Sequence, residues 1–207
     1  MKGQTGLKSS KKVIGITGNS GGGKTTVCKI IDGMGYKSID CDEISHRVML
    51  SGQSAFVKIV EAFGKEILGT DGQIDRKKLG AIVFGDEGKR TLLESIVHPI
   101  VIEQVLDELA AADSDCVIVE AVLLVESGLH KYCDAVWLVT ASEEERLKRI
   151  IARDNLSVEA AQARMRNQRD TAHIAEIAQA IIVNDGDLEL LQWQVKSALQ
   201  RLMNSEK

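Results

Sequence analysis

The spacing of apolar positions predicts a buried strand, a turn and a helix near the start of the chain. Residues 13–17 form an apolar run that ends in a glycine-rich turn. Such a run is typical of a strand buried on both faces of a parallel sheet. A helix should follow, because Val27, Ile30 and Ile31 recur at helical spacing and Gly33 supplies a stop signal.

The same alternation continues along the chain. Four further strand candidates lie at residues 37–40, 116–124, 135–139 and 181–183, and within the second of these runs the strand before Glu120 covers residues 116–119. Strands that alternate with helices form a parallel sheet covered by helices on both faces. The pattern therefore predicts an α/β fold of three layers around a five-stranded parallel sheet.

Helix start signals fix several of the connecting helices. Ser142 with Glu145 has the spacing of a capping box, Ser157 is a second cap for a helix ending near Gln168, and the last helix opens at Asp187. From residue 44 to about residue 112 the pattern is helical, with a loop expected at residues 69–72. We expect the only proline, Pro99, in the first turn of a helix that carries residues 101–109.

Composition narrows the class of protein. Of 207 residues, 44% are hydrophobic and 27% charged, which is typical of a globular protein with a sizeable core. The net charge of -4 builds no broad positive field, so nucleic acid is not an expected partner. No apolar run approaches the length of a membrane span, and we expect a cytoplasmic protein without a membrane partner. Its four scattered cysteines lack metal-ligand spacing and are expected to be reduced and mostly buried.

The first glycine-rich turn carries the strongest chemical signal. It matches the P-loop pattern GxxxxGKT and lies between a predicted strand and a predicted helix, the context that the pattern requires. Converging backbone N–H groups and the helix N-terminus favour phosphate binding there. The expected ATP cradle consists of Gly18, Asn19, Ser20, Gly21, Gly22, Gly23, Lys24 and Thr25.

Individual side chains in this turn have distinct expected roles. Lys24 should bridge the β- and γ-phosphates, and the Thr25 hydroxyl should ligate Mg²⁺. Thr26 either contacts the α-phosphate or packs. We therefore expect ATP as phosphoryl donor and Mg²⁺ as cofactor.

Carboxylates at predicted strand ends are candidates for the rest of the site, because ligands bind at the carboxyl edge of a parallel sheet. Asp40 and Asp42 follow the second strand, where one of them either faces an acceptor hydroxyl or caps a helix that begins near Glu43. Glu120 ends the third strand and either holds a magnesium-bound water or is a surface charge. Glu126 is either a substrate contact or a solvated loop residue.

A basic helix follows the fourth strand. Arg146, Arg149 and Arg153 share one face of it, beside Lys148. Such a face is usually solvated. Next to a P-loop it is also suited to a lid that closes over ATP and brings guanidinium groups to the transferred charge.

Taken in order, these motifs resemble the dephospho-coenzyme A kinases from about residue 13 to residue 195. The P-loop is common to many families, whereas the ordered set is more specific. The matching segments are Ile14-Gly15-Ile16-Thr17-Gly18, Ile39-Asp40-Cys41-Asp42-Glu43-Ile44, Asp75-Arg76 with Leu79, His98-Pro99, Leu123-Leu124 with Glu126, Leu147 with Arg149, Arg153-Asp154, and Asn184 with Gly186.

The resemblance implies a reaction: transfer of the γ-phosphoryl group of ATP to the ribose 3′-hydroxyl of dephospho-coenzyme A. It implies that Asp42 is the carboxylate beside that hydroxyl and that Asp40 supports the site. It places Arg149 as a lid arginine near the ATP phosphates. Asn184 would lie in the loop that approaches adenine. Acceptor contacts are implied for Arg76, His98, Leu124 and Glu126.

The chain departs from the family pattern at four positions. Glu120 stands where aspartate is usual and Val122 where proline is usual. Ile174 replaces a basic residue, and Gln179 replaces an aspartate before the last strand. Two alternatives to the implied activity are a kinase for a nucleoside, a nucleoside monophosphate or another small alcohol, and a nucleotide-dependent switch or binding module without transfer activity.

The expected organisation is a disordered tail followed by one P-loop kinase domain, acting as a monomer or small homo-oligomer. The tail covers residues 1–12 and the domain residues 13–207. Within the domain we expect a core of about 13–41, 114–141 and 178–207, a helical acceptor-binding insert of about 42–112, and a lid of about 142–177.

Overall fold

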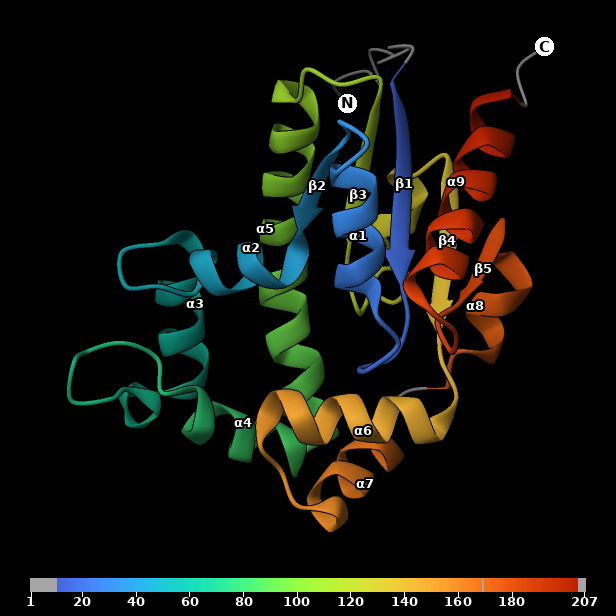
Figure 1. The fold of residues 1–207 in the computed structure, drawn as a ribbon. Coiled ribbons are helices and arrows are strands. Elements are labelled where there is room, and N and C mark those ends of the chain that lie inside the picture. Colours follow the sequence, from blue (N-terminus) through green and yellow to red (C-terminus); the bar gives the residue numbers. More distant parts are fainter. Residues whose placement is uncertain (1–10, 169, 205–207) are drawn as a thin grey trace. The chain divides into compact units, whose positions relative to one another are not determined.

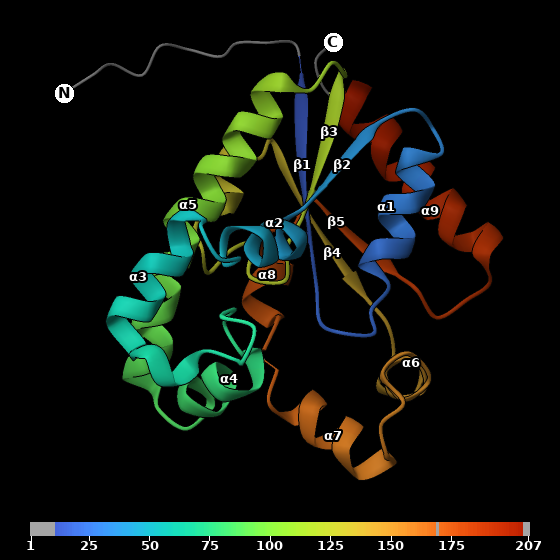
Figure 2. The ribbon, with the colours of Figure 1, turned by 90° about the vertical axis from the view of Figure 1, so that its left-hand side faces the viewer.

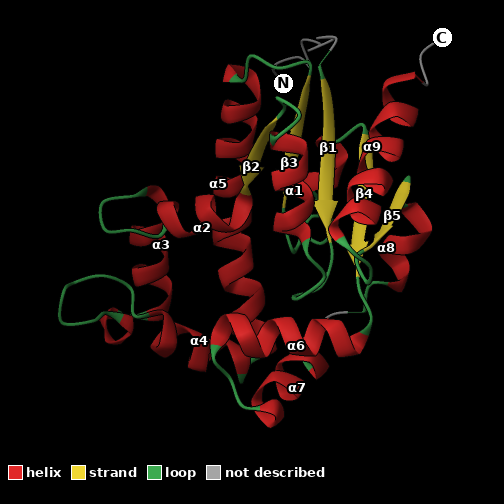
Figure 3. Cartoon of the chain, in the orientation of Figure 1, coloured by secondary structure: helices red, strands yellow, loops and turns green. Residues whose placement is uncertain are grey.

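The computed structural model describes residues 11–168 and 170–204, which form two compact units. One unit comprises residues up to 39 and from 112 onward and contains the sheet, and the other comprises residues 40–111. Strands and helices alternate in the first unit, whereas the second is built of helices (Figures 1 and 3). Residues 1–10 of the expected tail lie outside the described residues, and Lys12 already belongs to the first strand.

The sheet has five strands in the order β2-β3-β1-β4-β5. The pairs β1–β3, β1–β4 and β4–β5 are parallel, which confirms the predicted parallel sheet. The strands are β1 (Lys12–Thr17), β2 (Lys37–Asp40), β3 (Cys116–Glu120), β4 (Ala135–Thr140) and β5 (Ala180–Val183).

Two helices of the first unit, α1 and α9, lie side by side against one face of the sheet (Figures 1 and 2). Every second side chain of β1 and β4 points to this face, where Ile14, Ile16 and Trp137 are buried with Val27 of α1 and Val195 of α9. On the other face α8 contacts β4. The elements besides the strands are α1 (Lys24–Asp32), η2 (Leu129–Tyr132), α6 (Glu143–Asp154), α7 (Val158–Arg166), α8 (Ala172–Ile177) and α9 (Leu188–Asn204).

The predicted helix starts are confirmed by side chains that accept backbone hydrogen bonds. Ser142 Oγ accepts from the Glu145 amide at 3.4 Å, and Ser157 Oγ accepts from the Ala160 amide at 3.2 Å. Asp187 Oδ1 likewise accepts from the Leu190 amide at 2.8 Å. Each bond satisfies one of the amides that a helix leaves unpaired in its first turn.

The second unit packs shorter helices against one long helix. Its elements are α2 (Cys41–Val48), α3 (Ser54–Phe63), η1 (Lys65–Ile67), α4 (Arg76–Phe84) and α5 (Glu87–Ala111). Helices α2, α3 and α4 all contact α5, which contributes the buried side chains Val97, Val101 and Val105.

The expected position of Pro99 in a first helical turn is wrong, because α5 begins twelve residues earlier, at Glu87, and Pro99 lies in its interior. Proline has no N–H to donate to the carbonyl four residues before it, which costs roughly 3 kcal/mol within a helix. The flanking residues Val97, Ile100 and Val101 are buried. Their packing outweighs the missing hydrogen bond, so one helix continues where the sequence suggested a new start.

The strand register brings several candidate residues to one edge of the sheet. Ile16 pairs with Glu120, so residues 18–25 leave β1 beside the end of β3. Thr140 pairs with Val183, so Asn184 follows β5 at the same edge.

Within the described residues, no helix is long and apolar enough to cross a bilayer.

Candidate active site

The glycine-rich turn connects β1 to α1 as predicted, and its backbone requires glycine. Gly18, Gly21 and Gly23 have φ values of 143°, 82° and 99°. A Cβ at Gly18 would lie 2.0 Å from the Val139 carbonyl oxygen of β4. The turn therefore runs against the neighbouring strand at a distance that excludes any side chain, and it ends at the N-terminus of α1 at Lys24. This is the geometry of an anion-binding loop.

Thr25, Glu120 and Lys24 are brought together around this turn. Thr25 Oγ1 donates to Glu120 Oε1 at 3.0 Å. A hydroxyl and a carboxylate are the hard oxygen donors that Mg²⁺ prefers, so the pair fits the expected metal ligands. Lys24 Nζ donates to the Gly18 carbonyl at 3.0 Å and spans its own loop. Thr26 is exposed.

No cluster of three or more His, Cys, Asp or Glu side chains suited to a metal occurs in the described part of the chain. A magnesium site built from one hydroxyl and one carboxylate does not need such a cluster, because Mg²⁺ commonly keeps several waters and takes oxygens from bound phosphates.

Arg149 and Asn184, predicted from separate motifs, meet at the glycine-rich turn. Arg149 donates from Nη1 to the Gly21 carbonyl at 3.2 Å and from Nη2 to the Asn184 carbonyl at 2.7 Å. Asn184 Nδ2 donates to the Gly22 carbonyl at 3.0 Å, and the residue is only 7% exposed. Both side chains thus touch the backbone of the loop that is expected to bind phosphate.

Two further arginines of α6 also contact this loop, although the sequence identified them only as part of a basic face. Arg146 donates from Nε to the Ser20 carbonyl at 3.2 Å and from Nη2 to Gln168 Oε1 at 2.7 Å. Arg153 Nη2 donates to Ser20 Oγ at 3.1 Å. The spacing of residues 146, 149 and 153 on one helical face was the signal that could have identified them.

In the second unit, the aspartates at the end of β2 and in the first turn of α2 have separate roles. Asp40 is the N-cap of α2, since its Oδ1 accepts from the amides of Asp42 and Glu43 at 2.8 and 3.1 Å. The capping alternative is therefore realised by Asp40. Asp42 lies in the exposed first turn of α2, where its side chain is accessible to a ligand.

The second unit also contains a cavity of about 350 Å³ that one predicted residue lines. Arg76, the first residue of α4, lies with Nη1 3.4 Å from His46 Nδ1 at this cavity. His98 is half-buried in α5. His46 was missed because a histidine between two unrelated motifs carries no sequence signal of its own. Most of the remaining lining is apolar and comprises Met49, Leu50, Ile74, Leu79, Val83, Phe84 and Leu93.

Two predicted acceptor contacts follow β3 in the first unit, and their environments differ. Leu124 is fully buried, and a Cβ at Gly15 would lie 2.6 Å from its Cδ2. Its side chain is therefore part of the core, and a contact with the acceptor stays a prediction. Glu126 has one carboxylate oxygen 4.0 Å from His173 Nε2. Its other oxygen is buried and has no hydrogen-bond partner among the residues that the structure describes.

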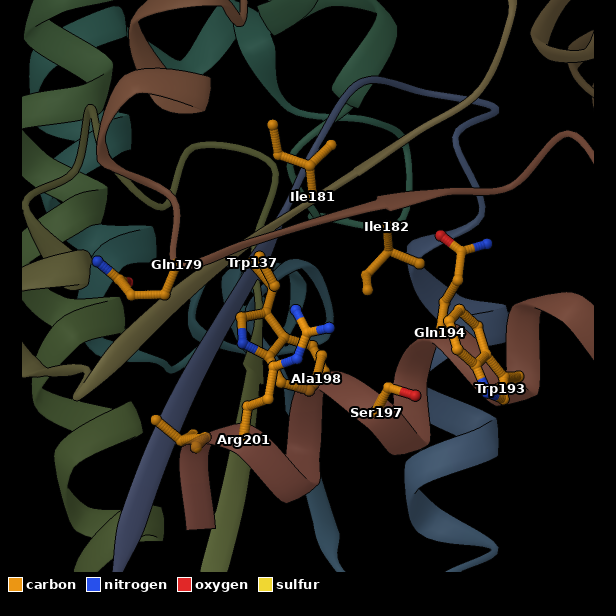
Figure 4. A pocket seen from close by; sticks show the side chains of 11 residues that line it. Trp137, Gln179, Ile181, Ile182, Trp193, Gln194, Ser197, Ala198 and Arg201 are labelled. Atoms are coloured by element: carbon orange, nitrogen blue, oxygen red, sulfur yellow. The ribbon is translucent and has the colours of Figure 1, made fainter. Parts of the chain in front are cut away.

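A larger cavity of about 460 Å³ lies at the edge of the sheet, between β5 and α9 (Figure 4). Trp137, Ile182 and Trp193 line it together with Arg201, its one charged lining residue in the described chain. The residues predicted for catalysis or binding do not line it. Gln179 also lines this cavity; it accepts from the Val136 amide at 2.6 Å and donates to the Ile177 carbonyl at 2.9 Å.

The departures at Gln179 and Ile174 are accommodated locally. The Gln179 amide oxygen accepts a backbone hydrogen bond, as a carboxylate oxygen also does. Ile174 is 2% exposed, so an apolar side chain suits its position in α8. Val122 is 39% exposed, and its carbonyl accepts from Thr17 Oγ1 at 3.1 Å.

Comparisons with known proteins agree on one family. Residues 12–189 match the family described as dephospho-CoA kinase. A dephospho-CoA kinase of Moorella thermoacetica is 41% identical over 194 residues, which cover 92% of each chain. A solved structure of a dephospho-CoA kinase from Campylobacter jejuni is 30% identical, with a TM-score of 0.68, and covers 95% of this chain and all of its own. A crystal structure of a Thermus thermophilus protein is 33% identical with a TM-score of 0.80, covering 93% of this chain and 98% of its own.

Proposed function

This chain belongs to the dephospho-CoA kinase family, and from that premise we propose how its residues phosphorylate dephospho-coenzyme A to coenzyme A. In this reaction the acceptor's ribose 3′-oxygen forms a bond to the γ-phosphorus of ATP. The bond from that phosphorus to the β,γ-bridging oxygen breaks, and ADP leaves. The proton of the hydroxyl must pass to a base. Phosphoryl transfer of this kind depends mainly on positioning and on stabilisation of charge.

The ATP side of the proposed site is the glycine-rich turn with its neighbours. Lys24 would bridge the β- and γ-phosphates, and Arg149 would stabilise charge on the transferred group. The supporting observation is that Arg149 and Asn184 both donate to carbonyls of this turn, at 3.2 and 3.0 Å. Two residues from distant segments thus converge on one phosphate-binding loop, and this convergence carries the proposal. Thr26 remains a candidate contact for the α-phosphate.

Magnesium is the metal that the proposed reaction needs. Thr25 and Glu120 would hold it, because their oxygens lie 3.0 Å apart beside the loop. When bound, Mg²⁺ neutralises part of the negative charge of the phosphates. The longer side chain of Glu120, in place of the usual aspartate, reaches the Thr25 hydroxyl directly.

The acceptor side of the proposed site draws Asp42, Arg76 and His98 from the helical unit and Glu126 from the other unit. Asp42 would orient the 3′-hydroxyl and accept its proton late in the transfer, and Asp40 would support it by capping the same helix. Arg76 and His98 would bind the acceptor. The cavity beside Arg76 is mostly apolar, which suits the pantetheine arm, while the guanidinium suits the diphosphate of the acceptor. Glu126 supplies a buried carboxylate oxygen that is available for a donor.

The remaining properties follow from surface and cysteine chemistry. We place the enzyme in the cytoplasm as a monomer or small homo-oligomer that does not bind nucleic acid. The four cysteines are free thiols, which suits a reducing compartment. The net charge of -4 supplies no polyanion-binding field. Light scattering and cell fractionation test these points.

The direct test is ADP formation with Mg²⁺, ATP and a panel of acceptors: dephospho-coenzyme A, adenosine and AMP. We expect turnover that depends on dephospho-coenzyme A. Asp42→Asn should lower kcat by a factor of about 100 or more, a typical loss for a group that acts on a proton, with the KM for ATP little changed. The matched control is Glu43→Gln, which removes the adjacent exposed carboxylate of the same helical turn and should leave kcat unchanged.

Two results would contradict the proposal. Turnover that is faster with adenosine or AMP than with dephospho-coenzyme A would assign a different acceptor. Full activity of Asp42→Asn would reduce Asp42 to a residue of the first turn of α2 without a role in the reaction.

A further inference from the structure

Three consecutive carbonyls of the glycine-rich turn are held by side chains from outside it. Ser20 O accepts from Arg146 Nε at 3.2 Å. Gly21 O accepts from Arg149 Nη1 at 3.2 Å, and Gly22 O accepts from Asn184 Nδ2 at 3.0 Å. Two of these donors come from α6 and the third from the loop after β5. We call Arg146, Arg149 and Asn184 the carbonyl shell.

The carbonyl shell fixes the direction of the amides that follow each carbonyl. The described peptide bonds are all trans, and in a trans peptide the C=O and N–H bonds point in opposite directions. Holding the carbonyls of residues 20–22 toward the shell therefore turns the N–H groups of residues 21–23 away from it. The amide of Gly22 bonds to the Asn19 carbonyl at 3.1 Å within the turn. Among the residues that the structure describes, the amides of Gly21 and Gly23 bond to no other backbone group, which leaves them available to a ligand.

Asn184 is held through both its backbone and its side chain. Its backbone amide donates to Thr140 O at 2.8 Å, and its carbonyl accepts from Arg149. Its side chain lies directly on the turn, because a Cβ at Gly23 would be 2.0 Å from Nδ2. The buried side-chain amide of Asn184 therefore contacts the loop backbone and restrains its conformation.

Ordering a turn that contains three glycines in four residues has a large cost in conformational entropy, because glycine loses more conformational freedom than any other residue. A ligand that has to order it binds more weakly than one that meets an ordered loop. Fixed hydrogen bonds to three carbonyls supply that order before a nucleotide arrives.

We propose that Asn184 and Arg146 are positioning residues that hold the phosphate-binding turn in its triphosphate-binding conformation. Asn184 thus contributes to nucleotide affinity through Gly22 and recognises no part of the base. The inference rests on the proposed function only in that the turn binds the triphosphate of ATP. It makes no use of the acceptor.

The test compares the binding of ATP and of inorganic tripolyphosphate by isothermal titration calorimetry. Asn184→Ala should weaken both ligands by the same factor, about tenfold, which corresponds to about 1.4 kcal/mol. Asn184→Asp should weaken both further, because its carboxylate has no donor for Gly22 O and repels phosphate. A contact to adenine would instead weaken ATP and leave tripolyphosphate unchanged.

The matched control is Gln194→Ala. Gln194 is also an amide that bonds to backbone, through Val183 N at 3.0 Å and Val183 O at 2.8 Å, one residue before Asn184. The Gln194→Ala variant should be less stable than wild type and should bind tripolyphosphate with the affinity of wild type. Arg146→Lys removes the Nε donor and keeps the charge, and it should also weaken the binding of both ligands. This second variant serves as the test if Asn184→Ala does not fold.

Hydrogen exchange of the free protein gives an independent readout. Amides of residues 19–24 should exchange faster in Asn184→Ala than in wild type, whereas those of β5 should not. The proposal is overturned if the Asn184 and Arg146 variants bind tripolyphosphate like wild type, if only ATP binding falls, or if wild type binds ATP without binding tripolyphosphate. Failure to phosphorylate dephospho-coenzyme A would refute the proposed acceptor and leave these results intact.

Discussion

Gly23 and Gly35 form a natural pair for separating backbone strain from side-chain crowding. Their φ values are 99° and 91°, both in the region that favours glycine. A Cβ at Gly23 would lie 2.0 Å from Asn184 Nδ2, whereas a Cβ at Gly35 would meet nothing within 4 Å. Substitution by alanine therefore imposes a similar backbone penalty at both sites, and only at Gly23 must another residue move.

The size of the difference follows from these contacts. An alanine with positive φ costs about 1–2 kcal/mol, from which roughly 0.4–1 kcal/mol is recovered because the unfolded chain becomes less flexible. Gly35→Ala should thus lower the free energy of unfolding by about 1 kcal/mol. Gly23→Ala also displaces the buried Asn184 amide from Gly22 O, and an unsatisfied buried polar group costs about 1–3 kcal/mol. Its total should be about 2–4 kcal/mol.

Urea unfolding and ATP titration measure the two consequences. Gly23→Ala should be less stable than Gly35→Ala and should bind ATP at least about tenfold more weakly than wild type, a loss of about 1.4 kcal/mol, because the phosphate-binding turn is displaced. Gly35→Ala should bind ATP normally. Equal stability and equal ATP affinity of the two variants would refute the reasoning, since Asn184 would then yield without cost.

Three further outcomes are expected. Thr25→Val should raise the Mg²⁺ concentration for half-maximal activity about tenfold, whereas Thr25→Ser should keep it near the wild-type value. The effects of Thr25→Val and Glu120→Gln on this concentration should be non-additive in the double variant, as expected for residues in contact. Burial raises the pKa of the Cys116 thiol from 9.0 to about 11. The stability that this neutral thiol contributes is therefore present below pH 9 and falls by about 2 kcal/mol as the pH rises toward 11. In urea melts, Cys116→Ala should not show this alkaline loss of stability. Gln179→Ala should lower stability by about 1 kcal/mol by leaving the Val136 amide unpaired, and Gln179→Asp should retain most of it in thermal melts. The first expectation would be contradicted by an Mg²⁺ requirement that Thr25→Val leaves unchanged. The second would be contradicted by an equal loss of stability at alkaline pH in wild type and Cys116→Ala, and the third by a Gln179→Asp variant as unstable as Gln179→Ala.

The sequence predicted the strands and the glycine-rich turn well because both depend on local pattern. The bounds of β2 agree with the prediction, and those of β1 and β5 differ by one residue at their starts. Helix α8 was missed, since its six residues are too few to show a helical period. Pro99 was misplaced because local propensity favours a helix start, whereas the packing of Val97 and Val101 continues the helix.

The site was only partly accessible to sequence reasoning. Motif spacing identified Lys24 and Thr25, and the end of a predicted strand identified Glu120; the structure brings these residues together at the glycine-rich turn. Motif spacing did not show that Asn184 donates to Gly22, because that contact joins segments 162 residues apart. Leu124 shows the opposite limit: it lies within a motif, yet its side chain is buried in the core. Contacts of this kind depend on tertiary packing that no local pattern encodes.

The central claim is that this chain moves the γ-phosphoryl group of ATP to the ribose of dephospho-coenzyme A. The most direct measurement is ³¹P NMR of a mixture of the protein with Mg²⁺, ATP and dephospho-coenzyme A. We predict that a 3′-phosphomonoester resonance of coenzyme A grows in step with ADP, and that Lys24→Ala abolishes both. Release of inorganic phosphate with ADP, and no new phosphomonoester, would contradict the account.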